Sequence, residues 1–254
     1  KVCYPFMKKI LVIYYSQTGQ LKQILDSLLH PLSDDPAVSV EYLEIQPATA
    51  YPFPWTRSEF LEVFPESVLE KPIGLKPWTT EHPGEHDLVI LAFQPWYLSP
   101  SLPVTAFLQS PEAEKIIRGA DVLTLIGARN MWVKSFERVK ERLENLGGRL
   151  RGNIVLVDRA PNLVSVVTIC YWMFTGKKDR CLGVFPPPGV SNADIAAAGK
   201  FGEAIGSLLE HDRMDELDET LQKLGVTDIN VSLARLENRA KKVFFLWANA
   251  ITKR

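Results

Sequence analysis

Five apolar runs along the chain have the length and pattern of buried β-strands. Four are continuously apolar and rich in β-branched residues, as KILVIYY is at 9–15, and the run at 38–45 alternates apolar and polar positions. Helical spacing appears between runs, at Leu21, Ile24, Leu25 and Leu28 and along one face of 131–148. Strands that alternate with helices predict a doubly wound, five-stranded parallel α/β sheet. The predicted strands cover 9–15, 38–45, 87–94, 121–127 and 152–158.

Two regions depart from this alternation. Residues 46–86 are rich in proline and aromatic side chains, which predicts an irregular insertion with one short helix at 57–64. After residue 160 three helices are expected, at 192–210, 213–224 and 230–252. We therefore divide the chain into a sheet domain at 7–160 and a mostly helical extension at 161–254 that packs on it. Residues 1–6 are interpreted as sequence upstream of an initiator Met7.

Composition excludes several classes of protein. The net charge of −1 argues against a basic nucleic-acid surface and against the strongly acidic surface of many electron carriers. Three cysteines, Cys3, Cys170 and Cys181, are too few and too poorly spaced for a metal site or a disulfide framework. The apolar run after Met7 is shorter than a signal peptide requires, and no run reaches membrane-spanning length. A cytoplasmic location fits best.

The loop after the first strand carries the first candidate chemistry. In a doubly wound sheet, ligands bind at the carboxyl ends of the strands. There, YYSQTGQL offers the hydroxyls of Ser16 and Thr18, a turn at Gly19 and the first amides of the next helix, which together could cradle a phosphate. The loop matches neither the dinucleotide-binding nor the P-loop motif. A simple helix cap is an equally good explanation for this loop on its own.

Two further strand ends favour a ligand. The 87–94 strand ends in QPWYL and the 121–127 strand ends in GARNMW, so aromatic side chains and an arginine would meet the first loop. Each tryptophan alone is more often a packing residue, but the three loops together suit a flat, phosphorylated aromatic ligand. The candidate cofactor-binding residues are Ser16, Gln17, Thr18, Gly19, Gln20, Leu21, Gln94, Pro95, Trp96, Tyr97, Leu98, Gly127, Arg129, Asn130, Met131 and Trp132.

These motifs resemble the flavodoxin-like proteins. YYSQTGQ is similar to their FMN-phosphate loop, although Leu21 stands where a further threonine is usual, and QPWYLSPSLPVTAFL resembles the quinone-reductase loop along the isoalloxazine. A closer resemblance, in YPFPW, FPESV, LIGARNMW and FGEAIGSLL, is to the flavodoxin-like proteins of dialkylresorcinol and stilbene pathways, often called condensing enzymes. It implies a flavodoxin-like fold, bound FMN and a role in secondary metabolism.

The residues argue against condensation and for a redox step. A condensing cysteine needs an activating histidine, and His30, His82, His86 and His211 do not fall at the strand ends. The resemblance instead suggests an FMN-dependent oxidoreductase that aromatises an alkylated cyclohexane-1,3-dione to a resorcinol. Arg129 would hold the enolate and Tyr97 orient a carbonyl, with a loop salt bridge and aromatic packing as their respective alternatives. Asp158 is a weak candidate base, more often an ion-pair partner of Arg159 or a helix cap.

Alternatives remain for the function and for the C-terminal helix. The chain could be a flavodoxin-like quinone reductase, an electron carrier, or a non-catalytic binding protein that has lost the flavin. The aromatic segments 51–64 and 163–174 could roof an apolar pocket or form ordinary core. In the C-terminal helix, Leu233, Leu236, Ala240, Val243, Phe244, Trp247 and Ile251 form a predicted apolar stripe. That stripe could dock on the domain, lie on a membrane surface or contact a second copy.

Overall fold

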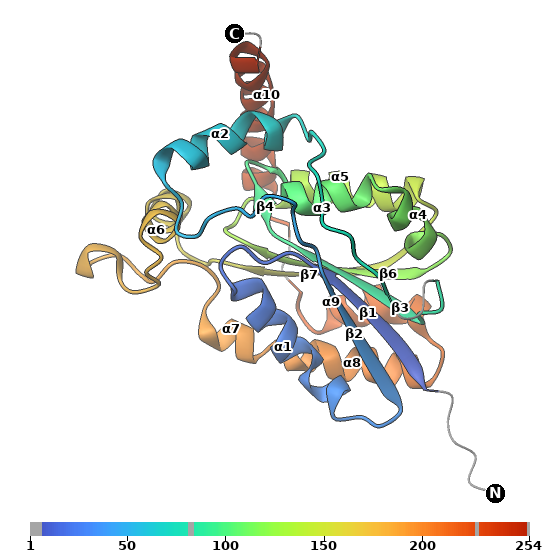
Figure 1. The fold of residues 1–254 in the computed structure, drawn as a ribbon. Coiled ribbons are helices and arrows are strands. Elements are labelled where there is room, and N and C mark those ends of the chain that lie inside the picture. Colours follow the sequence, from blue (N-terminus) through green and yellow to red (C-terminus); the bar gives the residue numbers. More distant parts are fainter. Residues whose placement is uncertain (1–6, 81–83, 227–228, 253–254) are drawn as a thin grey trace, which may run out of the picture.

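The main sheet has five parallel strands in the order β2-β1-β3-β6-β7 (Figure 1). The computed structural model describes residues 7–80, 84–226 and 229–252. Counted along the chain within this sheet, the order is 2-1-3-4-5, the flavodoxin-like form of the doubly wound fold, and the predicted fold is confirmed. The strands are β1 Lys8–Tyr14, β2 Val38–Glu44, β3 Leu88–Phe93, β6 Asp121–Ala128 and β7 Arg149–Val157.

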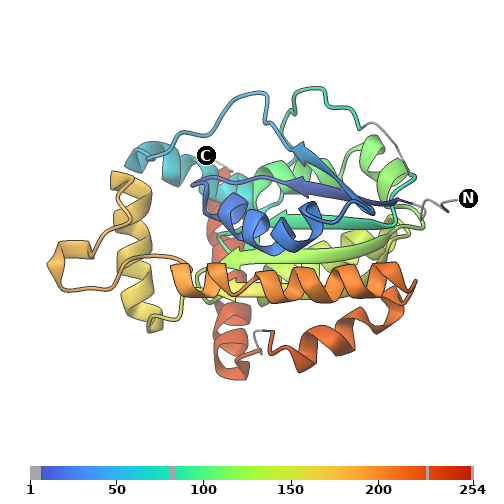
Figure 2. The ribbon, with the colours of Figure 1, turned by 90° about the horizontal axis from the view of Figure 1, so that it is seen from below.

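Helices cover both faces of the sheet, and each face has its own core (Figures 1 and 2). The apolar runs make this possible, because alternate residues of a strand point to opposite faces and both sets must be buried. On one face lie α1 Gln20–Ser33, α7 Asn192–Ala196, α8 Gly199–Glu210 and α9 Leu217–Lys223. On the other lie α3 Leu102–Leu108, α4 Pro111–Ile117 and α5 Val133–Asn145.

Helix α8 of the extension packs closely on α1. A Cβ atom at Gly202 would lie 1.9 Å from the carbonyl oxygen of Leu28, so only glycine permits this approach. Figure 2 shows the two helices side by side. The extension is therefore part of the same folded unit as the sheet.

Within the insertion 46–86, residues 47–75 form a closed loop. An isolated bridge joins Pro47 to Leu75, and the Ala48 amide donates to the Gly74 carbonyl at 2.8 Å. The loop holds α2 Arg57–Val68, one turn longer than the predicted 57–64 helix. A capping box of Thr56 and Glu59 starts α2.

The helices after residue 160 correct three predictions. Helix α6 Asn162–Thr175 was not predicted, because its apolar run has little one-sided pattern. The single helix expected at 192–210 is divided between α7 and α8, and the one at 213–224 becomes the 3-10 turn η2 Met214–Glu216 followed by α9. A second 3-10 turn, η1, covers Cys181–Gly183.

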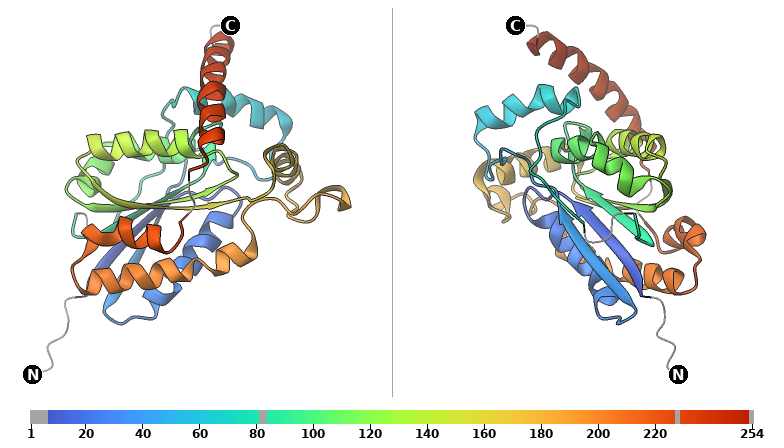
Figure 3. Two further views of the ribbon diagram at one scale, coloured as in Figure 1. Left: turned by 180° about the vertical axis from the view of Figure 1, so that it is seen from behind. Right: turned by 45° about the vertical axis from the view of Figure 1, so that its right-hand side comes forward.

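The last helix, α10 Val231–Thr252, runs out from the body of the molecule past α2 and α5 (Figures 1 and 3). It matches the predicted 230–252 helix. Among the described helices, none combines the length and the apolar character that crossing a lipid bilayer requires.

Candidate functional site

A cavity of about 390 Å³ lies at the carboxyl edge of the sheet, where β1, β3 and β6 end. This edge next to β1 and β3 is the topological switch point of the fold, at which doubly wound proteins bind ligands. Helices α2, α6 and α10 complete its walls. Twelve of the sixteen candidate residues line it, namely Gln17, Thr18, Gln20, Leu21, Gln94, Pro95, Trp96, Tyr97, Leu98, Gly127, Arg129 and Met131.

The loop after β1 leaves hydrogen-bonding groups without partners. The Ser16 hydroxyl is buried and has none. Gly19, at φ +81°, is the N-cap residue of α1 and supplies no side-chain cap, so the start of the helix is open to a ligand. The Thr18 Oγ1 accepts only a long bond of 3.4 Å from the Gln20 amide. A helix cap therefore does not explain Ser16. Thr18 lines the cavity, whereas Ser16 is not part of the lining.

Three glutamines hold this loop in place. In the orientation that satisfies its neighbours, the Gln94 side-chain amide donates to the Tyr15 carbonyl at 2.8 Å and accepts from the Gln17 backbone N–H at 3.1 Å. The Gln17 Nε2 donates to the Pro52 carbonyl of the insertion at 2.7 Å. The Gln20 side chain donates to the Val190 carbonyl at 3.0 Å and accepts from the Val190 amide at 3.1 Å. Their side chains are thus committed to positioning the backbone.

The QPWYL segment forms a tight hairpin. It consists of β4 Pro95–Trp96 and β5 Ser99–Pro100, with Tyr97 and Leu98 as the two turn residues. Both turn residues have positive φ, at 49° and 64°, as the two-residue hairpin turn that matches strand twist requires. The hairpin turns the Trp96 ring toward the aromatic side chains of the insertion.

Trp96 lies in an aromatic cluster at one end of the cavity. Its ring centroid is 5.0 Å from that of Tyr51, 5.6 Å from that of Trp55 and 5.9 Å from that of Tyr15, all edge-on. Burial raises the pKa of Tyr51 to about 12, so the phenol is neutral at physiological pH. The cluster gives the cavity a rigid apolar wall.

Tyr97 is built into the packing between the hairpin and α2. Its hydroxyl donates to the Phe60 carbonyl, and its ring centroid lies 5.2 Å from Phe60 and 5.1 Å from Phe64. Burial raises its pKa well above the usual range. Its contacts agree with the packing alternative, although the side chain also lines the cavity.

Arg129 is the one formally charged residue among the described residues that line the cavity. Its Nη1 donates to the Asn162 carbonyl at 3.0 Å, to Asn162 Oδ1 at 2.8 Å and to Ser165 Oγ at 3.1 Å, and its Nη2 contacts the Met131 Sδ at 3.2 Å. All of these partners are neutral, so the salt bridge considered from the sequence is not what holds it. Burial lowers the pKa of Arg129, yet arginine stays protonated in proteins.

Trp132 and Asn130, which follow Arg129 closely in the sequence, have different surroundings. Trp132 is buried at the start of α5, with its ring centroid 6.0 Å from that of Phe136, and does not line the cavity. Asn130 donates to Ser165 Oγ at 3.4 Å, and its buried Oδ1 has no partner. Trp132 is therefore a core residue rather than a stacking platform in this structure.

Asp158 has a structural role that the sequence did not predict. Its carboxylate accepts from the Ala160 amide at 2.9 Å and from the Gly189 amide at 3.1 Å. Arg159 pairs with Asp194 at 2.7 Å instead, so the ion pair expected between Asp158 and Arg159 is wrong. The reason is that two backbone amides already satisfy the carboxylate.

Both aromatic segments proposed as a roof do line the cavity, through Trp55, Phe60 and Val63 of the insertion and Val166, Ile169, Cys170, Trp172 and Met173 of α6. Cys170 lies among them, and burial raises the pKa of its thiol. The described histidines, His30, His86 and His211, are absent from the lining, and His82 lies outside the described residues. Cys3 lies outside them as well. The cavity therefore has no described cysteine–histidine pair for condensation.

Sequence reasoning missed the contribution of α10. Ala240 and Phe244 reach the cavity from the far end of the chain, and Ile24 and Gly189 also line it. Helical periodicity marked Ala240 and Phe244 as apolar, but no local pattern tells which element an apolar stripe will meet.

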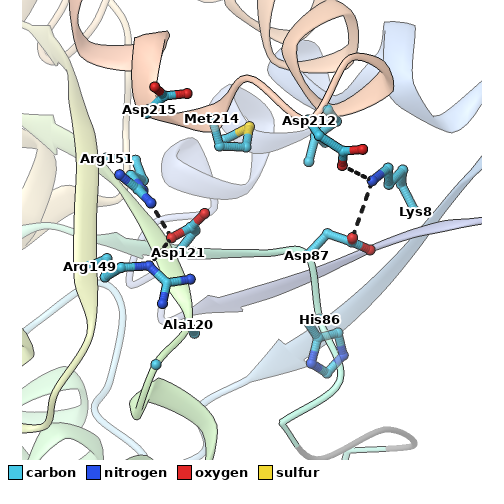
Figure 4. Close-up of a pocket in the computed structure, with 12 residues that line it drawn as sticks. Lys8, His86, Asp87, Ala120, Asp121, Arg149, Arg151, Asp212, Met214 and Asp215 are labelled. Atoms are coloured by element: carbon cyan, nitrogen blue, oxygen red, sulfur yellow. Dashed lines mark hydrogen bonds and ion pairs between the residues drawn. The ribbon is translucent and has the colours of Figure 1, made fainter.

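A second cavity of about 390 Å³ lies at the opposite, amino edge of the sheet (Figure 4). Most of its charged side chains are paired: Lys8 with Asp87 at 3.5 Å and with Asp212, and Asp121 with Arg149 at 2.6 Å and Arg151 at 2.9 Å, while Asp215 adds a further carboxylate to the lining. Figure 4 shows these as two separate groups. Charges that satisfy one another leave little to attract a ligand, so the carboxyl-edge cavity is the candidate site.

Comparison with known proteins gives only distant likenesses. No protein-family model and no curated protein matches the chain. A flavoprotein from Lactobacillus acidophilus, solved in complex with FMN, is 15% identical at a TM-score of 0.44, over 58% of this chain and 93% of its own.

Two further solved structures extend over more of the chain. A WrbA-like flavodoxin from Agrobacterium tumefaciens is 9% identical at a TM-score of 0.40, over 80% of this chain and 98% of its own. Flavodoxin 1 from Bacillus cereus is 13% identical at a TM-score of 0.39, over 77% and 95%. At these scores the fold assignment rests on the strand order of the chain itself.

Proposed function

We propose that this chain binds FMN at the carboxyl edge of its sheet and oxidises an alkylated cyclohexane-1,3-dione to a resorcinol. The observation that carries the proposal is Arg129, a single cation with neutral partners in a cavity of otherwise uncharged side chains. Such a group favours a planar, delocalised anion. The substrate class comes from the family resemblance of the strand-end loops.

The residues present fit FMN. The orphaned Ser16 hydroxyl, Thr18 and the open first turn of α1 would hold the phosphate, and the 94–98 and 127–131 segments would border the ring. Leu21 replaces a threonine of the resembling family, but its backbone amide is still part of that first turn. When bound, FMN supplies an acceptor for two electrons.

The chain's own residues account for the rest of the chemistry. A 1,3-dione is acidic and reaches the site as an enolate, which Arg129 would hold. The overall change from enolate to resorcinol is the loss of one hydride equivalent, for which bound FMN would supply the acceptor. No described carboxylate or histidine lines the cavity, so the initial proton is lost to solvent. The apolar side chains of α2, α6 and α10 would exclude water and receive the alkyl substituents.

The walls of the cavity also favour an enzyme over an electron carrier. A carrier must bring its flavin edge close to a protein partner, whereas α2, α6 and α10 enclose this cavity. The net charge of −1 gives little steering toward a charged partner.

The test is anaerobic. Purified protein loaded with FMN is mixed with a synthetic dialkylcyclohexane-1,3-dione, and we expect the flavin absorbance to bleach as resorcinol forms. If the flavin stays oxidised in excess dione while a quinone rapidly reoxidises the prereduced protein, the chain is a quinone reductase. If the protein takes up no FMN, the flavin site itself is refuted.

A further inference from the structure

We propose that α10 and the outer face of α6 dock the protein on an anionic lipid surface, with the cavity opening between them. This inference concerns an interaction surface and holds whatever reaction the cavity performs. It starts from the way α10 is attached to the domain.

Charged residues, rather than the predicted apolar stripe, define the docked face of α10. Glu237 is fully buried and accepts from the amides of Val133 and Lys134, at 3.2 and 2.8 Å, and so caps α5. Lys241 donates to the Leu98 carbonyl at 3.3 Å and to Ser99 Oγ. Ala248 completes this face. Of the predicted stripe, Ala240 and Phe244 line the cavity, whereas Leu236, Val243, Trp247 and Ile251 stay exposed, so the docking alternative holds only in part.

These exposed residues form a continuous apolar face. Leu236, Val243 and Trp247 recur at helical spacing, so they lie along one side of α10. Leu246 is 71% exposed and Trp247 is 54% exposed. Figure 3 shows the end of α10 standing clear of the other elements. An apolar face of this kind is typical of a surface that another phase or molecule covers.

Basic side chains lie beside that apolar face. Arg235, Arg239 and Lys242 are exposed and lie on the side of α10 next to the apolar residues. The helix has four basic residues and one acidic residue, and the acidic one, Glu237, is buried as a cap. The exposed charges of the described helix are thus all basic, on a chain whose net charge is −1. Apolar side chains with tryptophan beside basic residues match the chemistry of an anionic lipid interface.

The same charges argue against a second copy of the chain as the occupant. Two α10 helices packed face to face would bring their basic residues together with no exposed acid on either helix to compensate. A lipid surface with anionic headgroups supplies the compensating charge.

Helix α6 continues the apolar surface to the mouth of the cavity. Leu163 is 79% exposed, and Val166 and Val167 are also exposed. Val166 lines the cavity as well, as does Phe244 of α10 next to Val243. After α6, Lys177, Lys178 and Arg180 outnumber the one acid, Asp179. Exposed apolar side chains thus lie on both helices that line the cavity, which would let an apolar ligand pass from lipid to site.

The experiment is co-sedimentation of the full chain with vesicles of phosphatidylcholine, with and without phosphatidylglycerol. We expect binding to the anionic vesicles that weakens at high salt. The combined variant R235Q/R239Q/K242Q should weaken partitioning roughly 100-fold, at about a factor of five per charge. The matched control K115Q/K140Q/K223Q removes three exposed charges from other helices and should bind like the native chain.

A second readout locates the contact. Tryptophan fluorescence should shift to the blue on vesicle binding, and Trp247→Phe should remove most of that shift while leaving sedimentation nearly intact. Equal binding by the two triple variants, or no binding by the native chain, would overturn the proposal. The proposal would also fail if the native chain were a dimer that does not bind vesicles and the variant Val243→Ser/Leu246→Ser were a monomer. The apolar face would then join two copies of the chain.

Discussion

The two ends of the sheet hold cavities of equal volume, about 390 Å³, and opposite chemistry. At the amino edge, all three basic side chains form ion pairs with aspartates. At the carboxyl edge, one guanidinium has only neutral hydrogen-bond partners, and a buried hydroxyl has none. Paired charges on a surface contribute little to stability or binding, whereas unpaired groups in a desolvated site have free energy to gain from a ligand. The size of a cavity therefore says less than what its groups still lack.

The titration of the two ends differs in the same way. At the carboxyl end of β1, burial raises the pKa of Tyr14 to about 12, and it raises that of Tyr15 further. At the amino end, the pKa of Lys8 is raised mainly by its hydrogen bond to Asp212. Desolvation acts at one edge and charge pairing at the other.

The largest effect is expected at Arg129. Arg129→Gln removes the one cation of the described cavity lining and should slow dione oxidation roughly 100-fold, since a charge-assisted hydrogen bond is lost. Flavin affinity should change little. Arg149→Gln, which removes a paired arginine at the amino edge, should leave turnover unchanged. Steady-state kinetics with a flavin titration measures both. If Arg129→Gln released FMN, Arg129 would be identified as a cofactor ligand. That outcome would contradict its proposed role in binding the enolate.

Two serines that precede helices sharpen the comparison. Ser16 has a buried hydroxyl without a partner, whereas Ser110 caps α4 by accepting from the Ala113 amide at 3.2 Å. Ser16→Ala should weaken FMN binding at least about 10-fold and leave the unfolding free energy of the apoprotein nearly unchanged. Ser110→Ala should do the reverse, costing about 1 kcal/mol of stability with no effect on FMN. Apoprotein titration and urea unfolding separate the two, and equal flavin affinities would contradict the phosphate site.

Much of this site was predictable because local sequence patterns determine the strands and loops that form it. Continuous apolar runs specified β1, β3 and β6, and a parallel sheet brings the loops after them to one edge whatever the rest of the chain does. The positions of Thr18, Trp96 and Arg129 in the cavity lining follow from that alone.

The remainder depends on distant partners. Arg129 is held by Asn162 and Ser165 of α6, a helix whose apolar sequence has no one-sided pattern to reveal it. The sequence left the orientation of α10 open, and Glu237 and Lys241 determine it by facing inward to bond the backbone near α5 and β5. A hydrophobic pattern assigns charged residues to solvent, so it fails where a buried charge caps another element.

A smaller effect is expected in alkaline solution. The folded state holds Tyr14 protonated up to about pH 12, whereas the unfolded chain releases that proton near pH 10, so stability is complete below pH 10 and falls between the two values. Tyr14→Phe should reduce this loss by about 1 kcal/mol. Urea unfolding of both proteins at several pH values measures it. An identical pH dependence would mean that Tyr14 is solvated in the folded state.

The smallest effect belongs to the amino edge. Lys8 is partly exposed and its partner Asp212 is largely exposed, so solvent screens the pair, and Lys8→Met should change the unfolding free energy by less than about 0.5 kcal/mol at neutral pH. Because the pKa of Lys8 is raised in the folded state, its contribution is complete below the unfolded value of 10.5 and is lost as the pH rises beyond it. That pH window overlaps the one for Tyr14. The double variant Tyr14→Phe/Lys8→Met distinguishes them, since the two sites lie at opposite ends of β1 and their effects on the unfolding free energy should add.

In Lys8→Met, dione turnover and FMN affinity should match those of the native chain. A clear loss of either in Lys8→Met would make the amino-edge cavity part of the working site, and the contrast between paired and unpaired charges would no longer tell a ligand site from a structural one.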